Sequence, residues 1–337
     1  MSIGPFFRSP ANETHAIFKA CESREVGFAI SSVLIWKCHM TRTCIAIIIL
    51  SVAIGFSAPD AMAQGPVGEP SGPWRDQIHW VPARDAGGGS SLLYTRICRP
   101  PGDTPARVVL INHGAPPNPD ARPSMRPASC ENEAVRWFLT RGYLVVLGMR
   151  RGYGTTGGVW AETIGRRCGA AGYVRAGREG ASELDALVTY ATALPYARPD
   201  RVVVVGHSAG GWVTDLYDSL QHPKVVAMVS MAGGRGGHLD YIPNNNCRSD
   251  ELARAAGIAG ATASTPMLWV YAANDSYFAP EIAIAMHAAF TKAGGKAELI
   301  LPGAFGKDGH GLFFGKGGSA IWGPMMERYL ASRQASP

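Results

Sequence analysis

Short apolar runs alternate with helix-length stretches along most of the chain, and this pattern predicts a sheet flanked by helices. The clearest run is Val202 to Val205, four consecutive valines that are typical of a strand buried on both faces inside a parallel sheet. Similar runs predict strands at 107–112, 143–149, 225–231, 267–271 and 297–301. Helices are predicted between them, at 131–141, 180–194, 212–221, from Pro280 to Gly294, and at 321–332.

Two further strands, 77–81 and 92–98, precede this alternation and are joined by a turn-rich segment at 85–89. An opening hairpin followed by repeated strand–helix units predicts an α/β fold with a mostly parallel sheet of about eight strands and helices on both faces. We expect it to form a single domain over residues 77–333. Residues 64–76 are rich in glycine and proline, and we expect a flexible leader there.

The N-terminal part of the chain has the pattern of a targeting segment. A short basic region, an apolar run from Cys44 to Phe56 and an Ala-Met-Ala site ending at Ala63 form a secretory signal peptide over residues 40–63. It predicts cleavage after Ala63 and a secreted or periplasmic protein. The alternative is a membrane anchor, but the run is shorter than the ~20 apolar residues that a spanning helix needs. Residues 1–39 show no periodic pattern, and we interpret them as a non-native or unstructured extension ahead of a true start at Met40.

The composition is that of a globular protein, with 46% hydrophobic and 17% charged residues and a formal net charge of +6. The positive residues are scattered along the chain and form no basic stripe interleaved with aromatic residues. Nucleic acid is therefore not expected as a partner. The oligomeric state is left open.

Four of the seven cysteines follow the predicted cleavage site, and an even number in an exported protein predicts two disulfides. Three pairings are possible. We favour Cys98–Cys130 and Cys168–Cys247, because the first pair flanks one early unit and the second ties two loops together. None of these cysteines has CxxC spacing, so no metal site is predicted. Four reduced, buried thiols remain the alternative if the signal peptide is absent.

The motif Gly206-His207-Ser208-Ala209-Gly210 carries the strongest chemical signal. It follows the valine-rich strand and precedes a helix, so the G-x-S-x-G pattern stands where a strand turns sharply into a helix. Such a turn raises the serine hydroxyl above the sheet at a helix N-terminus. The alternative is a serine in an ordinary glycine-rich turn. We interpret Ser208 as a nucleophile.

A serine nucleophile needs a base and a group that orients the base. Groups that meet in an open parallel sheet lie at the carboxyl ends of strands, and this rule favours His310, just after the last strand, with His238 as a weaker alternative. Asp275 follows the strand before it and gives the chain order Ser, Asp, His that this type of triad has. Asp308 is the second candidate acid, although it more plausibly braces the loop, and Asp240 is the third.

Two backbone N–H groups are needed to hold the oxyanion that forms on the substrate. One is that of Ala209, directly after the nucleophile. The other is expected from the turn His113-Gly114-Ala115-Pro116 after an early strand, most plausibly from Ala115. The side chains of His113 and His207 are interpreted as structural.

Two other glycine-rich segments are not assigned a ligand. Arg151 to Gly158 lacks the G-K-[ST] ending of a phosphate-binding loop and is interpreted as a rim loop. Gly233 to Gly237 is interpreted as a turn. No cofactor is predicted.

Taken together, the chain resembles the α/β-hydrolase superfamily, and more narrowly the dienelactone hydrolase-like branch with its prolyl-oligopeptidase relatives. The resemblance covers the chain from about Arg107 to the last helix, and rests on Asn112-His113-Gly114, Arg150-Arg151-Gly152-Tyr153-Gly154, the serine motif, Asn274-Asp275 and Gly309-His310. Dienelactone hydrolases proper carry a cysteine nucleophile where this chain has Ser208, so lactone hydrolysis is not carried over. The resemblance implies a small lid insertion at 232–264, in which Tyr241 and Asn244, Asn245 and Asn246 shape the pocket.

The sequence therefore predicts an exported serine hydrolase that cleaves a carboxylic ester or related acyl bond of a small molecule. Ser208, His310 and Asp275 form its triad, and no membrane span remains after cleavage of the signal peptide. One alternative is a serine peptidase of the prolyl-oligopeptidase type. Another is a non-catalytic binding protein on a hydrolase scaffold, for which a broken triad would be expected.

Overall fold

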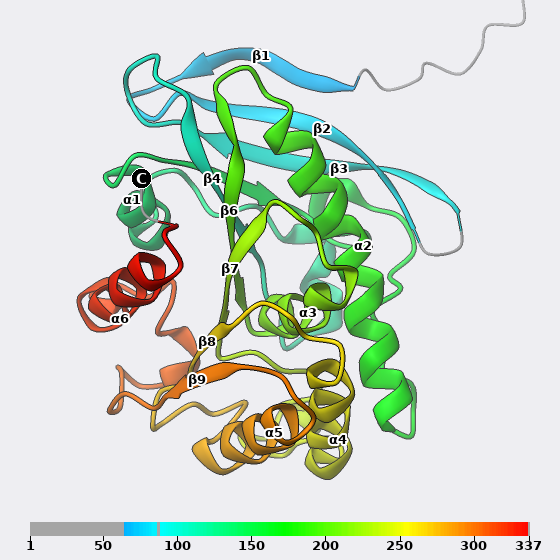
Figure 1. The fold of residues 1–337 in the computed structure, drawn as a ribbon. Helices are drawn as coiled ribbons and strands as arrows, with labels where there is room; N and C mark the ends of the chain where they lie inside the picture. Colours follow the sequence, from blue (N-terminus) through cyan, green and yellow to red (C-terminus); the bar gives the residue numbers. More distant parts are fainter. Residues whose placement is uncertain (1–63, 86–87, 336–337) are drawn as a thin grey trace, which may run out of the picture. The chain divides into compact units, whose positions relative to one another are not determined.

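Nine strands form one sheet in the residues that the computed structural model describes, 64–85 and 88–335. The strands are β1 (Gly65–Ser71), β2 (Asp76–Arg84), β3 (Ser90–Cys98), β4 (Ala106–Asn112), β5 (Tyr143–Gly148), β6 (Ala197–His207), β7 (Val225–Met231), β8 (Met267–Val270) and β9 (Ala297–Ile300). Their order in the sheet is β1-β2-β3-β5-β4-β6-β7-β8-β9. Neighbouring strands pair in parallel from β5 through β4, β6, β7 and β8 to β9 (Figure 1). The pairs β1·β2, β2·β3 and β3·β5 are antiparallel. The predicted α/β fold with a mostly parallel sheet is confirmed, with nine strands rather than about eight.

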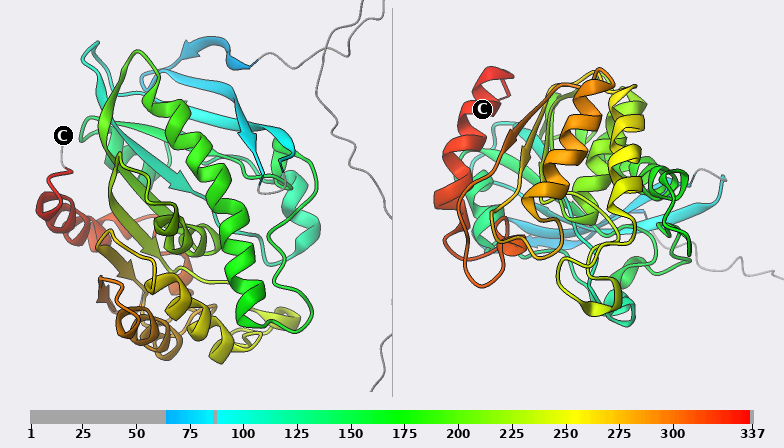
Figure 2. Two further views of the ribbon diagram at one scale, coloured as in Figure 1. Left: turned by 45° about the vertical axis from the view of Figure 1, so that its right-hand side comes forward. Right: turned by 90° about the horizontal axis from the view of Figure 1, so that it is seen from below.

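Six α-helices cover the two faces of this sheet. They are α1 (Glu133–Leu139), α2 (Ala170–Thr192), α3 (Ala209–Tyr217), α4 (Ser249–Gly260), α5 (Pro280–Lys292) and α6 (Gly318–Ser332). The core on one face contains side chains of α2, α3, α4 and α5, and the core on the other contains those of α1 and α6. Figures 1 and 2 show the same division, with α6 (red) on the opposite side of the sheet from α2 (green).

The valine run of β6 explains why this strand lies at the centre. Val202 and Val204 point into the core beneath α2 and α3, whereas Val203 and Val205 point into the core beneath α1 and α6. All four side chains are fully buried. Burial of a branched apolar side chain is worth about 1.5–3 kcal/mol, so each face of the strand stabilises one of the two helical layers.

Two predicted boundaries are wrong. The expected flexible leader at 64–76 contains strand β1, which pairs antiparallel with β2, because its backbone N–H and C=O groups find partners along that edge of the sheet. Helix α2 begins at Ala170 instead of 180. Its first half contains Gly172 and Gly177, which interrupt the apolar pattern; a Cβ on Gly177 would lie 2.6 Å from Leu216, so glycine permits close packing on α3.

The segment 232–264 is only partly a loop. Its second half is helix α4, whose side chains Leu252, Ala255 and Ala256 are fully buried in the core. The expected lid therefore does not extend over the whole segment. Residues 232–248 form the irregular part, with several non-glycine residues at positive φ, among them His238, Asp240, Tyr241 and Asn244.

Two disulfides join the pairs that the sequence analysis favoured, Cys98–Cys130 and Cys168–Cys247. The first ties the end of β3 to the segment before α1. The second ties Cys168, two residues before α2, to the irregular part of 232–248. The predicted signal peptide and the extension before it lie outside the described residues. Within the part of the chain that the structure describes, no helix has both the length and the apolar character needed to cross a membrane.

Removing the Cys98–Cys130 bond is expected to destabilise the fold. The bond closes a loop with a sequence separation of 32 residues, and the chain-entropy effect of such a loop is about 4 kcal/mol. The double variant Cys98→Ala/Cys130→Ala should therefore unfold at a clearly lower urea concentration. The single variant Cys98→Ala, which also lacks the bond, is the control and should lose a similar amount. An unchanged urea midpoint in both variants would contradict the pairing.

Candidate active site

Ser208 stands at a strained turn between β6 and α3. Its backbone has φ 55° and ψ −123°, a conformation that L-residues rarely adopt. A Cβ on Gly206 would lie 2.2 Å from the carbonyl oxygen of Gly210, and one on Gly210 would lie 2.2 Å from that of Asn112. Only glycine fits at either position. The turn is held by hydrogen bonds from the Ser208 N–H to Met231 and from the Gly234 N–H to Ser208.

His310 and Asp275 meet at the carboxyl ends of β8 and β9, as the sequence analysis expected. Nδ1 of His310 lies 3.0 and 3.1 Å from the two carboxylate oxygens of Asp275. Because a carboxylate only accepts hydrogen bonds, Nδ1 carries the proton and Nε2 is left as the acceptor. Asp275 is 2% exposed, and its Oδ1 also accepts the N–H groups of Tyr277 and Phe278 at 2.8 and 2.9 Å. The carboxylate is thereby held in one orientation.

Asp308, the second candidate acid, braces the loop instead of contacting the imidazole ring. Its Oδ1 accepts the N–H groups of Ser276 and His310, and its Oδ2 accepts the Ser276 hydroxyl at 2.7 Å. Burial alone would raise the pKa of Asp308, but these hydrogen bonds outweigh it and lower the pKa below its usual value. The third candidate, Asp240, is exposed.

The other histidines have structural partners. The ring of His238, the weaker candidate base, stacks on Tyr277 at 3.5 Å, and its Nε2 lies 2.9 Å from the Ser276 hydroxyl. The opposite face of Tyr277 stacks on His310 at 4.0 Å, so Tyr277 separates the two histidines. His207 donates from Nε2 to the carbonyl of His310 at 2.8 Å. Burial, with His310 as a second cause, lowers the pKa of His207 to about 4, so this ring is neutral.

Ser208, Ala209 and Ala115 line one pocket with a volume of about 280 Å³. A Cβ on Gly114 would lie 3.0 Å from Cβ of Ser208, so the turn that carries Ala115 passes directly beside the serine. Within residues 64–85 and 88–335, the N–H groups of Ala209 and Ala115 donate to no other residue. Both are therefore free to donate to a ligand in the pocket.

Tyr277 and Phe278 line the same pocket and are in ring contact with His310. These two side chains therefore border both the pocket that contains Ser208 and the ring of His310. In the described part of the chain, no hydrogen bond joins Ser208 to His310. Such a contact is often long in a ligand-free enzyme and shortens when substrate binds.

The asparagines expected to shape the pocket do not line it. Asn246 donates to the carbonyl of Tyr277 at 2.7 Å, the Asn244 N–H donates to the carbonyl of Ser276, and the Asn245 N–H donates to the carbonyl of Ile242. Tyr241 is 65% exposed. Two of the three asparagines therefore hold the backbone strip that presents Tyr277.

A buried charged cluster beside the pocket was missed by the sequence analysis. Glu162 is 3% exposed and accepts hydrogen bonds from the guanidinium groups of Arg150 and Arg235. The hydroxyl of Tyr153 donates to the same carboxylate at 3.1 Å. Arg150 also donates to the carbonyl of His113 at 2.7 Å, which fixes the turn that carries Ala115.

Arg235 lies in the segment that was interpreted as a turn and assigned no ligand, and its side chain lines the pocket. The Arg-Arg-Gly-Tyr motif at 150–153 pointed to this region, but no spacing rule brings Glu162 or Arg235 to it. Burial lowers the pKa of Arg150 and of Arg235, although both stay charged because a guanidinium starts far above neutral pH.

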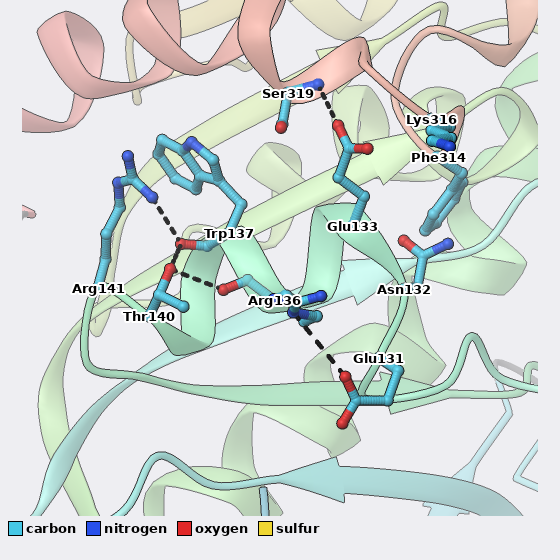
Figure 3. A pocket seen from close by; sticks show the side chains of 10 residues that line it. All are labelled: Glu131, Asn132, Glu133, Arg136, Trp137, Thr140, Arg141, Phe314, Lys316 and Ser319. Atoms are coloured by element: carbon cyan, nitrogen blue, oxygen red, sulfur yellow. Dashed lines mark hydrogen bonds and ion pairs between the residues drawn. The ribbon is translucent and has the colours of Figure 1, made fainter.

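A larger hollow of about 560 Å³ lies elsewhere, over α1 (Figure 3). Several of its charged side chains contact one another or the backbone: Glu131 pairs with Arg136 at 3.8 Å, and Glu133 accepts the N–H groups of Gly317 and Ser319. Arg141 stacks over Trp137. This hollow contains none of the predicted site residues.

One group of potential metal ligands occurs among the described residues, Asp76 with Cys98 and Cys130. The two sulfur atoms are joined in a disulfide, so neither is available as a thiolate. These residues do not fit a metal ion.

Comparison with known proteins connects this chain to the hydrolases. The family model of X-Pro dipeptidyl-peptidase (S15 family) matches residues 88–267, which include Ser208. No curated protein matches the chain.

Solved structures show the same fold. An acetyl xylan esterase from Paenibacillus sp. R4 is 15% identical with a TM-score of 0.52, covering 80% of this chain and 88% of its own. An esterase from Pyrococcus furiosus is 14% identical with a TM-score of 0.51, covering 80% and 98%. Dipeptidyl peptidase 4 from Porphyromonas gingivalis is 15% identical with a TM-score of 0.52, covering 76% of this chain and 35% of its own. The fold is the α/β-hydrolase fold that the sequence resembled.

Replacing each of the two carboxylates near His310 by an amide, one at a time, should distinguish their roles. Asp275→Asn places an amide against Nδ1 and favours the wrong tautomer of the ring, so we expect the labelling rate of Ser208 by a fluorophosphonate to fall by at least about a thousandfold. Asp308→Asn is the matched control, because it changes a carboxylate that contacts only the loop, and should cost about tenfold or less. Equal losses, with both variants folded by circular dichroism, would contradict the assignment.

Proposed function

Since the chain belongs to the X-Pro dipeptidyl-peptidase (S15) family and is a serine hydrolase, we propose that it cleaves a carboxylic ester or related acyl bond of a small molecule with the triad Ser208, His310 and Asp275. The observation that carries the proposal is the bidentate contact of His310 with Asp275 beside a pocket that contains the strained serine. No other described carboxylate contacts the ring of His310.

In the proposed reaction, Nε2 of His310 accepts the hydroxyl proton as Ser208 Oγ attacks the carbonyl carbon of the substrate. Asp275 holds the Nδ1–H and stabilises the imidazolium that forms. The N–H groups of Ala209 and Ala115 bind the oxyanion. His310 then gives the proton to the leaving alcohol, and an acyl-enzyme remains. Water, activated by His310, releases the acid and restores the serine.

A peptidase is the second candidate, because the matching family model is that of a dipeptidyl-peptidase. The same triad attacks an amide, and the two functions differ in what the pocket binds. Ester and Xaa-Pro amide substrates assayed side by side distinguish them.

We also propose that the protein is secreted or periplasmic, with the signal peptide at 40–63 removed. Two disulfides support this proposal, because such bonds persist mainly in oxidising compartments.

The kcat of the variant Ser208→Ala for a short-chain p-nitrophenyl ester is expected to be at least about a thousandfold lower than that of the wild type, because the nucleophile is gone. Ser182→Ala, on helix α2, is the control and should retain wild-type kcat. The measurement is steady-state hydrolysis followed by release of p-nitrophenol. Full activity in Ser208→Ala would refute the nucleophile.

Export is tested by expressing the chain from Met40 in a Gram-negative host and sequencing the N-terminus of the mature protein. We expect it in the periplasm or medium, beginning at Gln64. Deleting the apolar run 44–56 should keep the protein in the cytoplasm. A mature protein that retains residues 40–63, or that stays in the cytoplasm, would contradict the proposed signal peptide.

A further inference from the structure

The pocket beside Ser208 carries an excess of positive charge. Its charged lining residues are Arg122, Arg235 and Glu162. Behind Glu162 lies Arg150, which is 1% exposed and also pairs with that carboxylate. Among the lining residues, one carboxylate is therefore shared by two buried guanidinium groups, and Arg122 adds a third cation. Away from the pocket, the buried carboxylate of Glu183 also acts on Arg150.

Glu162 is already engaged by two arginines and a tyrosine. Oε1 accepts from Nε of Arg150, and Oε2 accepts from Arg235, from Nη2 of Arg150 at 3.4 Å and from the Tyr153 hydroxyl at 3.1 Å. An ammonium group that approached this carboxylate would lie beside the two guanidinium groups that already neutralise its charge. Repulsion from these cations disfavours an ammonium group there.

The arginines, in contrast, keep unused donors. Nε of Arg235 is buried and has no partner within the described residues, although the side chain is 7% exposed and lines the pocket. Arg122 lies over the ring of Trp160 with its Cζ 3.8 Å from the ring centre, and its only hydrogen bond in the described chain is from Nε to the carbonyl of Pro119. Its terminal nitrogens are free to bind a ligand.

Arg122 and Arg235 line the same pocket. Burial lowers the pKa of Arg235, and the charges of Arg150 and Arg122 lower it further by repulsion. An anion bound between Arg122 and Arg235 would relieve this repulsion and would accept charge-assisted hydrogen bonds from both.

We propose that the site selects esters that carry a carboxylate a short chain away from the scissile bond, with Arg122 and Arg235 as the residues that determine this specificity. The inference rests on the proposed function for its chemistry. Arg122, Arg235 and Ser208 line one pocket of about 280 Å³, so the anionic group and the reacting carbonyl belong to one small substrate. This selection is opposite to recognition of a substrate ammonium group.

Matched substrates test the proposal. On the acyl side these are the monoethyl ester of glutaric acid, ethyl pentanoate and the ethyl ester of γ-aminobutyric acid, which have similar length and differ in charge. On the alcohol side they are γ-acetoxybutyrate and pentyl acetate. We expect kcat/KM for the anionic member to exceed that for the neutral member by at least about tenfold in one series, the cationic ester to be the poorest, and the ratio to fall as salt is raised.

The variant Arg122→Gln should reduce the anionic-to-neutral ratio of kcat/KM by about tenfold or more. Arg126→Gln is the matched control, because Arg126 lies in the same segment, is exposed and does not line the pocket, and its ratio should equal that of the wild type. An anionic-to-neutral ratio near one in both series, or preference for the cationic ester, would overturn the proposal.

Binding to Ser208→Ala separates this inference from the proposed chemistry. Calorimetry with the monoethyl ester of glutaric acid and with ethyl pentanoate measures charge selection without turnover. Tighter binding of the anion with no hydrolysis by the wild type would refute the proposed reaction and retain the anionic site. Equal binding, together with hydrolysis of neutral esters by the wild type, would retain the reaction and refute the site.

Discussion

The turn between β6 and α3 is the constraint on which the rest of the site depends. Ser208 keeps its positive φ because the neighbouring backbone leaves no alternative: the residue is tied to β7 through Met231, and the segments on either side approach so closely that Gly206 and Gly210 cannot carry a Cβ. The strain is sustained by the buried valines of β6, which anchor the strand in both cores. Precise placement of the hydroxyl is thus a result of packing below the site.

The same sheet brings the other parts of the site together at the carboxyl ends of its parallel strands. Parallel pairing of β6, β7, β8 and β9 places the loops that carry Ser208, Arg235, Asp275 and His310 side by side, although they span over a hundred positions in the sequence. Two charge systems result. Asp275 holds the ring of His310, which is the basis of the proposed triad. Glu162 is paired with Arg150 and Arg235, which is the basis of the proposed anionic selectivity of the pocket.

Much of this arrangement could be predicted from the sequence. The valine run, the serine motif and the strand-end rule led to Ser208, Asp275 and His310 and to the correct pairs of cysteines, because each follows from local pattern and sheet topology. Strand β1 was missed, since its pairing with β2 is a tertiary effect that overrides a glycine- and proline-rich composition. The contact of Glu162 with Arg235 was missed for the same reason: two irregular loops meet there, and no periodicity reports where such loops fold.

Trapping the covalent intermediate tests the central claim most directly. The wild-type protein is mixed with an activated ester, quenched in acid within the first turnovers and digested, and the peptide masses are measured. The account predicts an acyl adduct on the peptide that contains Ser208, and its disappearance as the reaction is allowed to complete. Hydrolysis of the ester with no adduct, or with the acyl group on another residue, would contradict it.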